Sequence, residues 1–282
     1  MKKLLRTVLL ILFSVTFLIS SYYLLDYFLE SRKQSGKYDD LSQLVADARE
    51  EADVQVPDRS NLSGEDIDKG DITGEVKLVT VTDPNTGEEI SIISEYAQLY
   101  SRNDDFAGWI QIPDTKLDYP VVHRPEERDY YLYANFDGEY SSHGCIYARE
   151  ECDFQTPSDN VILYGHNMKD GTMFAPLNGY QSKDFWEDHQ YIFLDTRTER
   201  HIYQIFCVFT TTASIGQGFE YHMFVDAAGE EDFEDYVSDC HANEIYDTGI
   251  TAEYGDKLIT LSTCEYSQVN GRLVIVAKRI TD

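Results

Sequence analysis

The sequence predicts a mainly β protein with one closed or sandwich-like β domain, and three observations support this fold class. Residues 96–282 contain about eight short apolar or alternating runs separated by turn residues, a pattern typical of sandwiches and barrels. The chain holds 21 tyrosines, a residue type enriched in strands. Residues 1–29 read as a membrane anchor and residues 30–95 as a polar, acidic stem. The 282 residues therefore leave room for one globular domain rather than two.

Residues 7–25 predict a membrane-spanning helix. This stretch has 19 residues without a charge, and Lys2, Lys3 and Arg6 precede it. At about 1.5 Å per residue, a helix of this length crosses a hydrocarbon core of roughly 30 Å. A cleaved signal peptide is the alternative, but its apolar region is usually shorter and ends in small residues. The basic residues predict a single span, with this end in the cytoplasm and the remaining chain outside the cell.

The stem contains weaker signals. A short helix is predicted by an apolar stripe at helical spacing, formed by Leu41, Leu44, Val45 and Ala48. Residues 75–82 alternate as a strand does, residues 83–87 read as a turn, and a second apolar run follows at 90–93. These features predict a hairpin attached to the stem. Another helix is expected over about 94–101.

The predicted strands of the β domain follow one another at modest intervals. They are the runs 108–112, 119–122, 144–147, 160–164, 191–194, 201–212, 257–262 and 273–277. A long insertion separates the sixth and seventh runs. It contains an apolar stripe on an otherwise acidic helix, formed by Phe233, Tyr236, Val237 and Cys240. Such an insertion is typical of a lid or a binding wall, and a helix that caps one end of the sheet is equally compatible.

Charge excludes one class of partner. The chain has 23 Lys+Arg against 51 Asp+Glu, a net charge of −28, and most of the excess acid lies in residues 96–282. Such a surface repels phosphate backbones, so we expect no nucleic-acid partner. The acidity favours basic clients as a hypothesis, and a solubilising surface is the simpler explanation.

The cysteines predict no metal site. Their number is odd, so at least one is free or paired between chains, and they are Cys145, Cys152, Cys207, Cys240 and Cys264. No CxxC pair or Cys/His spacing suits zinc. A bridge between Cys145 and Cys152 stays open as an alternative. We expect no cofactor.

Three residues with reactive side chains stand at predicted strand ends. Cys264 ends the Thr-Leu-Ser-Thr-Cys run 260–264, and Arg272 opens the next strand eight residues later. His166 follows the buried-type strand 160–164. Antiparallel neighbours joined by a short loop bring Cys264 and Arg272 to one rim. A thiolate is a strong nucleophile, an imidazole moves protons and an arginine steadies an oxyanion, so the set predicts thiol-based acyl transfer.

These residues resemble the sortases, cysteine transpeptidases of Gram-positive cell surfaces, and among them class B. The resemblance covers about residues 96–282 and rests on the runs 106–110, 118–122, 130–132, 163–174 and 260–264 with Arg272. It implies a closed eight-stranded β-barrel, with an N-terminal helix and with the helix near 230–241 in the long loop before the cysteine strand. It implies no metal site.

The resemblance also implies a reaction at the cell surface. Cys264 would attack the threonine carbonyl of a C-terminal sorting motif in a secreted protein and form a thioester. An amine of a peptidoglycan precursor or of a pilin lysine would resolve it. His166 would act as general acid and then as base, and Arg272 would hold the substrate or the oxyanion. Leu132, Ser262 and Glu265 are the expected substrate-binding residues.

Two alternatives remain open from the sequence. The stretch Ser142-His143-Gly144-Cys145-Ile146 is similar to the cysteine signature of L,D-transpeptidases, although Tyr147 stands where that family has arginine. This alternative makes Cys145 the nucleophile. The other alternative is a non-catalytic, membrane-anchored wall-binding module.

Overall fold

The computed structural model describes residues 2–57, 59, 73–214, 216–267 and 269–280. The chain divides into two compact units, Met1–Asp40 and Leu41–Asp282. Helix α1 (Lys2–Ala52) begins in the first unit and ends in the second. Its most apolar 18-residue window has a mean hydropathy of 2.2 and no buried residue, so the helix is long and apolar enough to cross a membrane.

The stem is more helical than the sequence predicts. We expected a separate short helix at Leu41–Ala48, whereas α1 is continuous through this stretch. The reason is that no proline interrupts residues 26–52 and Gly36 is the only glycine there, so one helix propagates from the apolar segment. The predicted stripe is real, since Leu41, Val45 and Ala48 are buried within the second unit.

The predicted hairpin and the helix after it are confirmed. Strands β1 (Leu78–Thr82) and β2 (Glu89–Ile93) pair antiparallel, with Leu78 opposite Ile93. The chain then forms the 3₁₀ turn η1 (Ser94–Tyr96) and helix α3 (Ala97–Arg102), which leads into the barrel.

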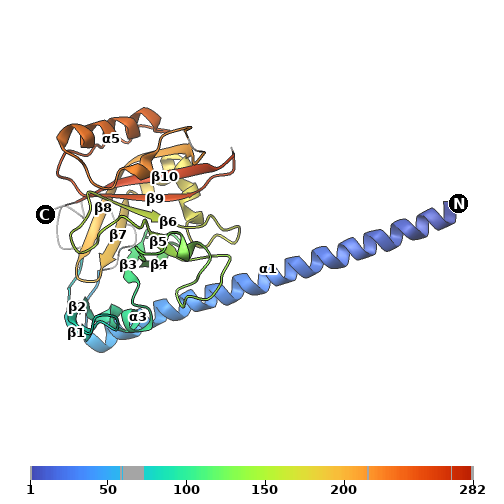
Figure 1. Cartoon of the computed structure of the whole chain (residues 1–282), viewed down its shortest axis with the longest axis horizontal. Coiled ribbons are helices and arrows are strands. Elements are labelled where there is room, and N and C mark those ends of the chain that lie inside the picture. The colour runs from blue at the N-terminus through green and yellow to red at the C-terminus, as the bar shows by residue number, and fades with distance from the viewer. Residues whose placement is uncertain (1, 58, 60–72, 215, 268, 281–282) are drawn as a thin grey trace. The chain divides into compact units, whose positions relative to one another are not determined.

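The main domain is a closed barrel of eight strands, as predicted (Figure 1). Its strands are β3 (Phe106–Gln111), β4 (Asp118–Val122), β5 (Ile146–Ala148), β6 (Asn160–Tyr164), β7 (Tyr191–Thr196), β8 (Arg200–Thr212), β9 (Leu258–Cys264) and β10 (Gly271–Arg279). They close in the order β10-β8-β7-β3-β4-β5-β6-β9. The pairs β4–β5 and β6–β9 are parallel and the other pairs are antiparallel. Closure leaves no unpaired barrel edge.

Short helical segments connect the strands. They are η2 (Tyr130–Leu132), η3 (Ala175–Gln181), α4 (Lys183–Asp188), η4 (Tyr221–Met223) and α5 (Glu230–Asn243). Helix α5 lies in the insertion between β8 and β9, where the sequence predicts it, and covers the barrel beside β8 (Figure 1). Its apolar stripe is buried against β8, β9 and β10, and the stripe consists of Phe233, Tyr236, Val237 and Cys240.

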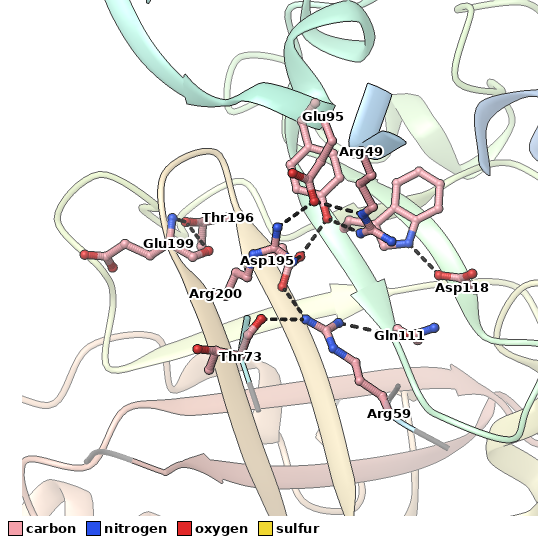
Figure 2. A network of polar contacts seen from close by, with 12 residues as sticks. Arg49, Arg59, Thr73, Glu95, Gln111, Asp118, Asp195, Thr196, Glu199 and Arg200 are labelled. Atoms are coloured by element: carbon pink, nitrogen blue, oxygen red, sulfur yellow. Dashed lines mark hydrogen bonds and ion pairs between the residues drawn. The ribbon is translucent and has the colours of Figure 1, made fainter. Parts of the chain in front are cut away.

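A buried ionic network joins the end of α1 to the barrel (Figure 2). Glu95 accepts hydrogen bonds from Arg49 at 2.9 Å and from Arg200 at 2.6 Å, and its side chain is fully buried. Asp195, which is equally buried, accepts one from Tyr96 at 2.7 Å and forms an ion pair with Arg59 at 3.4 Å. Removing a charge from water is costly unless it is paired, so the network makes the stem residues part of the folded domain.

Candidate active site

The candidate nucleophile ends strand β9. The Cα atom of Cys264 lies directly opposite that of Arg272, the second residue of β10. The backbone N–H of Glu265 donates to the Gly271 carbonyl at 2.9 Å and closes the connecting loop. Cys264 is half-buried, whereas the other four cysteines are buried, and the described cysteines form no disulfide. Cys264 is therefore the thiol that solvent and substrate reach most easily.

His166 comes to the same rim because β6 and β9 are parallel. Tyr164, the last residue of β6, lies opposite Ser262, so both strands end at the same side of the barrel. The Thr263 hydroxyl donates to the Gly165 carbonyl at 2.7 Å and fixes this junction. His166 lies two residues after Tyr164, and Cys264 lies two residues after Ser262. The sequence predicts a strand end for His166, and the parallel pairing of β6 with β9 brings that end to the rim of Cys264.

The orientation of the imidazole is set by a backbone carbonyl. Nε2–H of His166 donates to the Leu132 carbonyl at 2.7 Å. The ring also lies beside that of Tyr133, with centroids 5.7 Å apart. A carbonyl oxygen only accepts, so Nε2 carries a proton in this arrangement and Nδ1 is the ring atom left for other partners. Leu132 thus contributes a backbone acceptor to the site.

Arg272 is held at the start of its own strand. One of its terminal nitrogens, Nη1, donates to the carbonyls of Asn270 at 3.3 Å and Gly271 at 3.0 Å. Within the described residues, no side-chain hydrogen bond joins Arg272, His166 and Cys264 directly. The three groups surround one rim of the barrel, where a thiol, a proton carrier and a fixed cation suit acyl transfer.

The predicted substrate-binding residues have different environments. Ser262 is buried, and its hydroxyl lies 2.6 Å from that of Tyr221. Glu265 is half-buried and accepts hydrogen bonds from the backbone N–H of Ser267 at 2.8 Å and from its hydroxyl at 2.6 Å. The Glu265 carboxylate therefore orders the loop between β9 and β10. Substrate binding by Leu132, Ser262 and Glu265 remains a prediction.

Sequence reasoning missed Tyr221. This residue lies in η4, within the irregular part of the insertion, and is buried next to β9. Burial raises the pKa of its phenol, while the Ser262 hydrogen bond and Arg272 oppose the rise. The Tyr221 hydroxyl contacts Ser262, which lies two residues before Cys264 on β9. No periodic pattern in residues 213–229 could have identified it.

Two other features lie outside this site. A cavity of about 490 Å³ lies at the far end of the barrel, where β4 ends, and is lined by residues that include Asp105, His123, Glu151 and Phe154. None of the predicted site residues lines it. Among the described residues, no group of three or more His, Cys, Asp or Glu side chains could hold a metal ion.

A closed eight-stranded barrel with a half-exposed cysteine at the end of one strand is the fold of a class of cysteine transpeptidases. The Sortase domain profile matches residues 110–280, and the chain belongs to the sortase family. Sortase B of Listeria monocytogenes is 34% identical over 189 residues, which cover 66% of this chain and 74% of that protein.

Solved structures agree with this assignment. Sortase B of Clostridium perfringens is 31% identical, with a TM-score of 0.58 over 65% of this chain and 98% of the solved chain. A Staphylococcus aureus sortase B-substrate complex is 24% identical and shares the fold, with a TM-score of 0.69 over 90% of this chain and 99% of that one. The chain is thus a cysteine transpeptidase similar to class B sortases.

Proposed function

We propose that this sortase cleaves a C-terminal sorting motif of secreted proteins after a threonine and transfers the acyl group to an amine. The single observation that supports the proposal most is the Cα register of Cys264 opposite Arg272, with His166 at the end of the neighbouring parallel strand. This register supports the proposed roles of Cys264 as nucleophile, Arg272 as oxyanion-binding cation and His166 as proton carrier.

The proposed reaction has two half-reactions. The Cys264 thiolate attacks the threonine carbonyl, Arg272 stabilises the oxyanion, and the imidazolium of His166 protonates the departing amine. The products are a Cys264 thioester and the released C-terminal peptide. The acceptor amine then attacks the thioester, neutral His166 takes its proton, and the Cys264 thiolate leaves. Microscopic reversibility lets one imidazole serve both steps.

The acceptor class follows from the family chemistry. An amine of a peptidoglycan precursor or of a pilin lysine is the proposed nucleophile of the second step. A Staphylococcus aureus sortase B-substrate complex has been solved on the same fold, which is compatible with a substrate site on this barrel. The net charge of −28 is compatible with cationic clients. We also propose that α1 anchors the chain in the cell membrane and that the barrel lies outside the cell, because basic residues precede the apolar span.

The environment of Cys145 argues against the L,D-transpeptidase alternative. Cys145 is 1% exposed, and its thiol donates to the Pro120 carbonyl at 3.9 Å. A peptide has no access to a thiol in that position. The other alternative, a non-catalytic wall-binding module, does not explain why the accessible cysteine lies at the rim next to His166 and Arg272.

The test uses the full chain in detergent micelles and a library of quenched fluorescent peptides with threonine at the scissile position. We expect wild-type enzyme and Cys145→Ala to cleave the same peptides at similar rates. Cys264→Ala should fall below about 0.1% of the wild-type rate, because the covalent route is lost. Cleavage that survives in Cys264→Ala and disappears in Cys145→Ala would support the alternative nucleophile instead.

A further inference from the structure

We propose that Asn167 is a positioning residue, which fixes the loop that carries His166 against the backbone of Cys264, and that Asn178 holds the Asn167 amide in the required orientation. This inference rests on the proposed function of Cys264 and His166. The proposed role of both asparagines concerns the geometry of the two reactive groups, because their side chains bond to the Cys264 backbone and to each other.

The first observation is a direct bond between the two halves of the site. Nδ2 of Asn167 donates to the Cys264 carbonyl at 2.9 Å. Asn167 follows His166 in the chain, and Cys264 is the last residue of β9. One side chain therefore links the residue after the imidazole to the peptide unit of the nucleophile.

The second observation is that a reciprocal amide pair holds this side chain. Nδ2 of Asn167 also donates to Oδ1 of Asn178 at 3.1 Å, and Nδ2 of Asn178 donates to Oδ1 of Asn167 at 2.8 Å. Asn178 lies in η3 and donates in addition to the Ala175 carbonyl at 2.9 Å. Backbone carbonyls only accept hydrogen bonds, so Nδ2 of Asn167 must face the Cys264 carbonyl and Nδ2 of Asn178 must face the Ala175 carbonyl. Neither side-chain amide can therefore flip without losing a hydrogen bond.

The rest of the loop is anchored independently of Asn167. The Phe174 N–H donates to the His166 carbonyl at 2.9 Å. His143 and Asp170 form a bond of 2.9 Å that holds the far part of the loop. Loss of the Asn167 amide should therefore leave the loop folded and release the hydrogen bonds that its nitrogen donates to Cys264 and to Asn178.

Loss of the hydrogen bond between Asn167 and Cys264 should affect the chemical step more than substrate binding. A shift of about 1 Å between reacting groups can lower the rate about a hundredfold, because the groups must then be aligned during the reaction at a cost in entropy. A residue that does not contact the substrate leaves ground-state binding unchanged, so KM should hold while kcat falls.

The test uses the full chain in micelles and a peptide that wild-type enzyme cleaves. Asn167→Asp keeps the shape of the side chain but places an acceptor against the Cys264 carbonyl. It should lower kcat by about 10- to 100-fold, with KM within about twofold of wild type. Asn178→Ala should lower kcat by about 3- to 10-fold, since Asn167 keeps its donor but loses its orientation. Asn243→Asp is the matched control, because the exposed Asn243 side chain donates to the Asp239 carbonyl of α5, away from the predicted site residues, and its kcat should equal that of wild type.

The double variant separates positioning from general loss of structure. If Asn178 acts through Asn167, adding Asn178→Ala to Asn167→Asp should lower kcat no further. Iodoacetamide titration of Cys264 gives the fraction of intact enzyme to which each kcat is normalised. Equal kcat for Asn167→Asp and wild type, multiplicative losses in the double variant, or a loss confined to KM would each overturn the inference. If wild-type enzyme cleaves no library peptide, the proposed function fails and this inference fails with it.

Discussion

The hydroxyl groups of Tyr221 and Ser262 lie 2.6 Å apart, and they join the long insertion to the strand that ends in Cys264. Both side chains are buried. The insertion is therefore hydrogen-bonded directly to the strand that carries Cys264. Because burial raises the pKa of Tyr221, the phenol stays neutral and serves as a hydrogen-bonding group.

Removing one partner of this pair should cost more than removing both. Ser262→Ala leaves the Tyr221 hydroxyl buried without this partner, at a cost of about 1–3 kcal/mol. Tyr221→Phe leaves the Ser262 hydroxyl in the same situation. The double variant should be closer to wild type than the sum of the single losses. Melting temperatures of the four proteins in micelles test this, and simple additivity would contradict it.

Gly144 supports the carbonyl that orients His166. It adopts φ +59°, and a Cβ atom there would come within 2.6 Å of the carbonyl oxygens of Tyr131 and Leu132. Gly144→Ala should push the Leu132 carbonyl away from His166 and lower kcat by about tenfold or more. Gly249→Ala is the matched control, since Gly249 has φ +73° with no atom within 4 Å of its Cβ position. It should lose some stability and no activity. Equal effects of the two changes on kcat would refute the role of Gly144.

The buried ionic network should dominate the stability of the junction between stem and barrel. Arg200→Ala leaves Glu95 and Asp195 without one of their cations in a buried environment, at a cost of about 3–5 kcal/mol. The melting temperature should fall by about 10 °C. Arg102→Ala removes the more exposed pair with Asp137 and should lower it by about 2 °C or less. Similar shifts in the two variants would show that the network contributes little.

The barrel strands could be located from the sequence, whereas the length of α1 and the parallel strand pairs could not. Short apolar or alternating runs between turns located all eight barrel strands, and an apolar stripe at helical spacing located helix α5. The continuous α1 was missed because the polar stretch 26–40 has no apolar stripe, although nothing in it stops a helix. The parallel pairs β4–β5 and β6–β9 join segments far apart in the chain, and local patterns carry no information on such pairing.

Some residues of the candidate site could be predicted from the sequence and others could not. Cys264, His166 and Arg272 could be selected because each is a reactive residue at the end of a predicted strand. Tyr221 and the contact between Asn167 and Asn178 could not, since these contacts depend on how loops fold back over the barrel. Asn167 stands directly after His166 in the sequence, but its bond to Cys264 spans 97 residues.

Two partly buried histidines, His123 and His201, predict a loss of stability in mild acid. Burial lowers the pKa of His123 and of His201 below the model-peptide value of 6.5, and Arg279 lowers that of His201 further. Below about pH 6.5 the two histidines bind protons in the unfolded chain more readily than in the folded chain. Their contribution to the free energy of unfolding is therefore constant above about pH 6.5 and falls below it. The double variant His123→Gln/His201→Gln should lose less melting temperature than wild type between pH 7.5 and 5.5. Parallel pH curves for the two proteins would contradict this assignment.

In the proposed reaction, Cys264 carries the acyl group. The direct measurement is a rapid acid quench of wild-type enzyme with a cleavable peptide, followed by mass mapping of all five cysteines. We expect one adduct, on Cys264, with the mass of the acyl portion that ends in threonine. This adduct should disappear when an amine acceptor is added. An adduct on Cys145 or another cysteine, or cleavage without any adduct and undiminished in Cys264→Ala, would contradict the account.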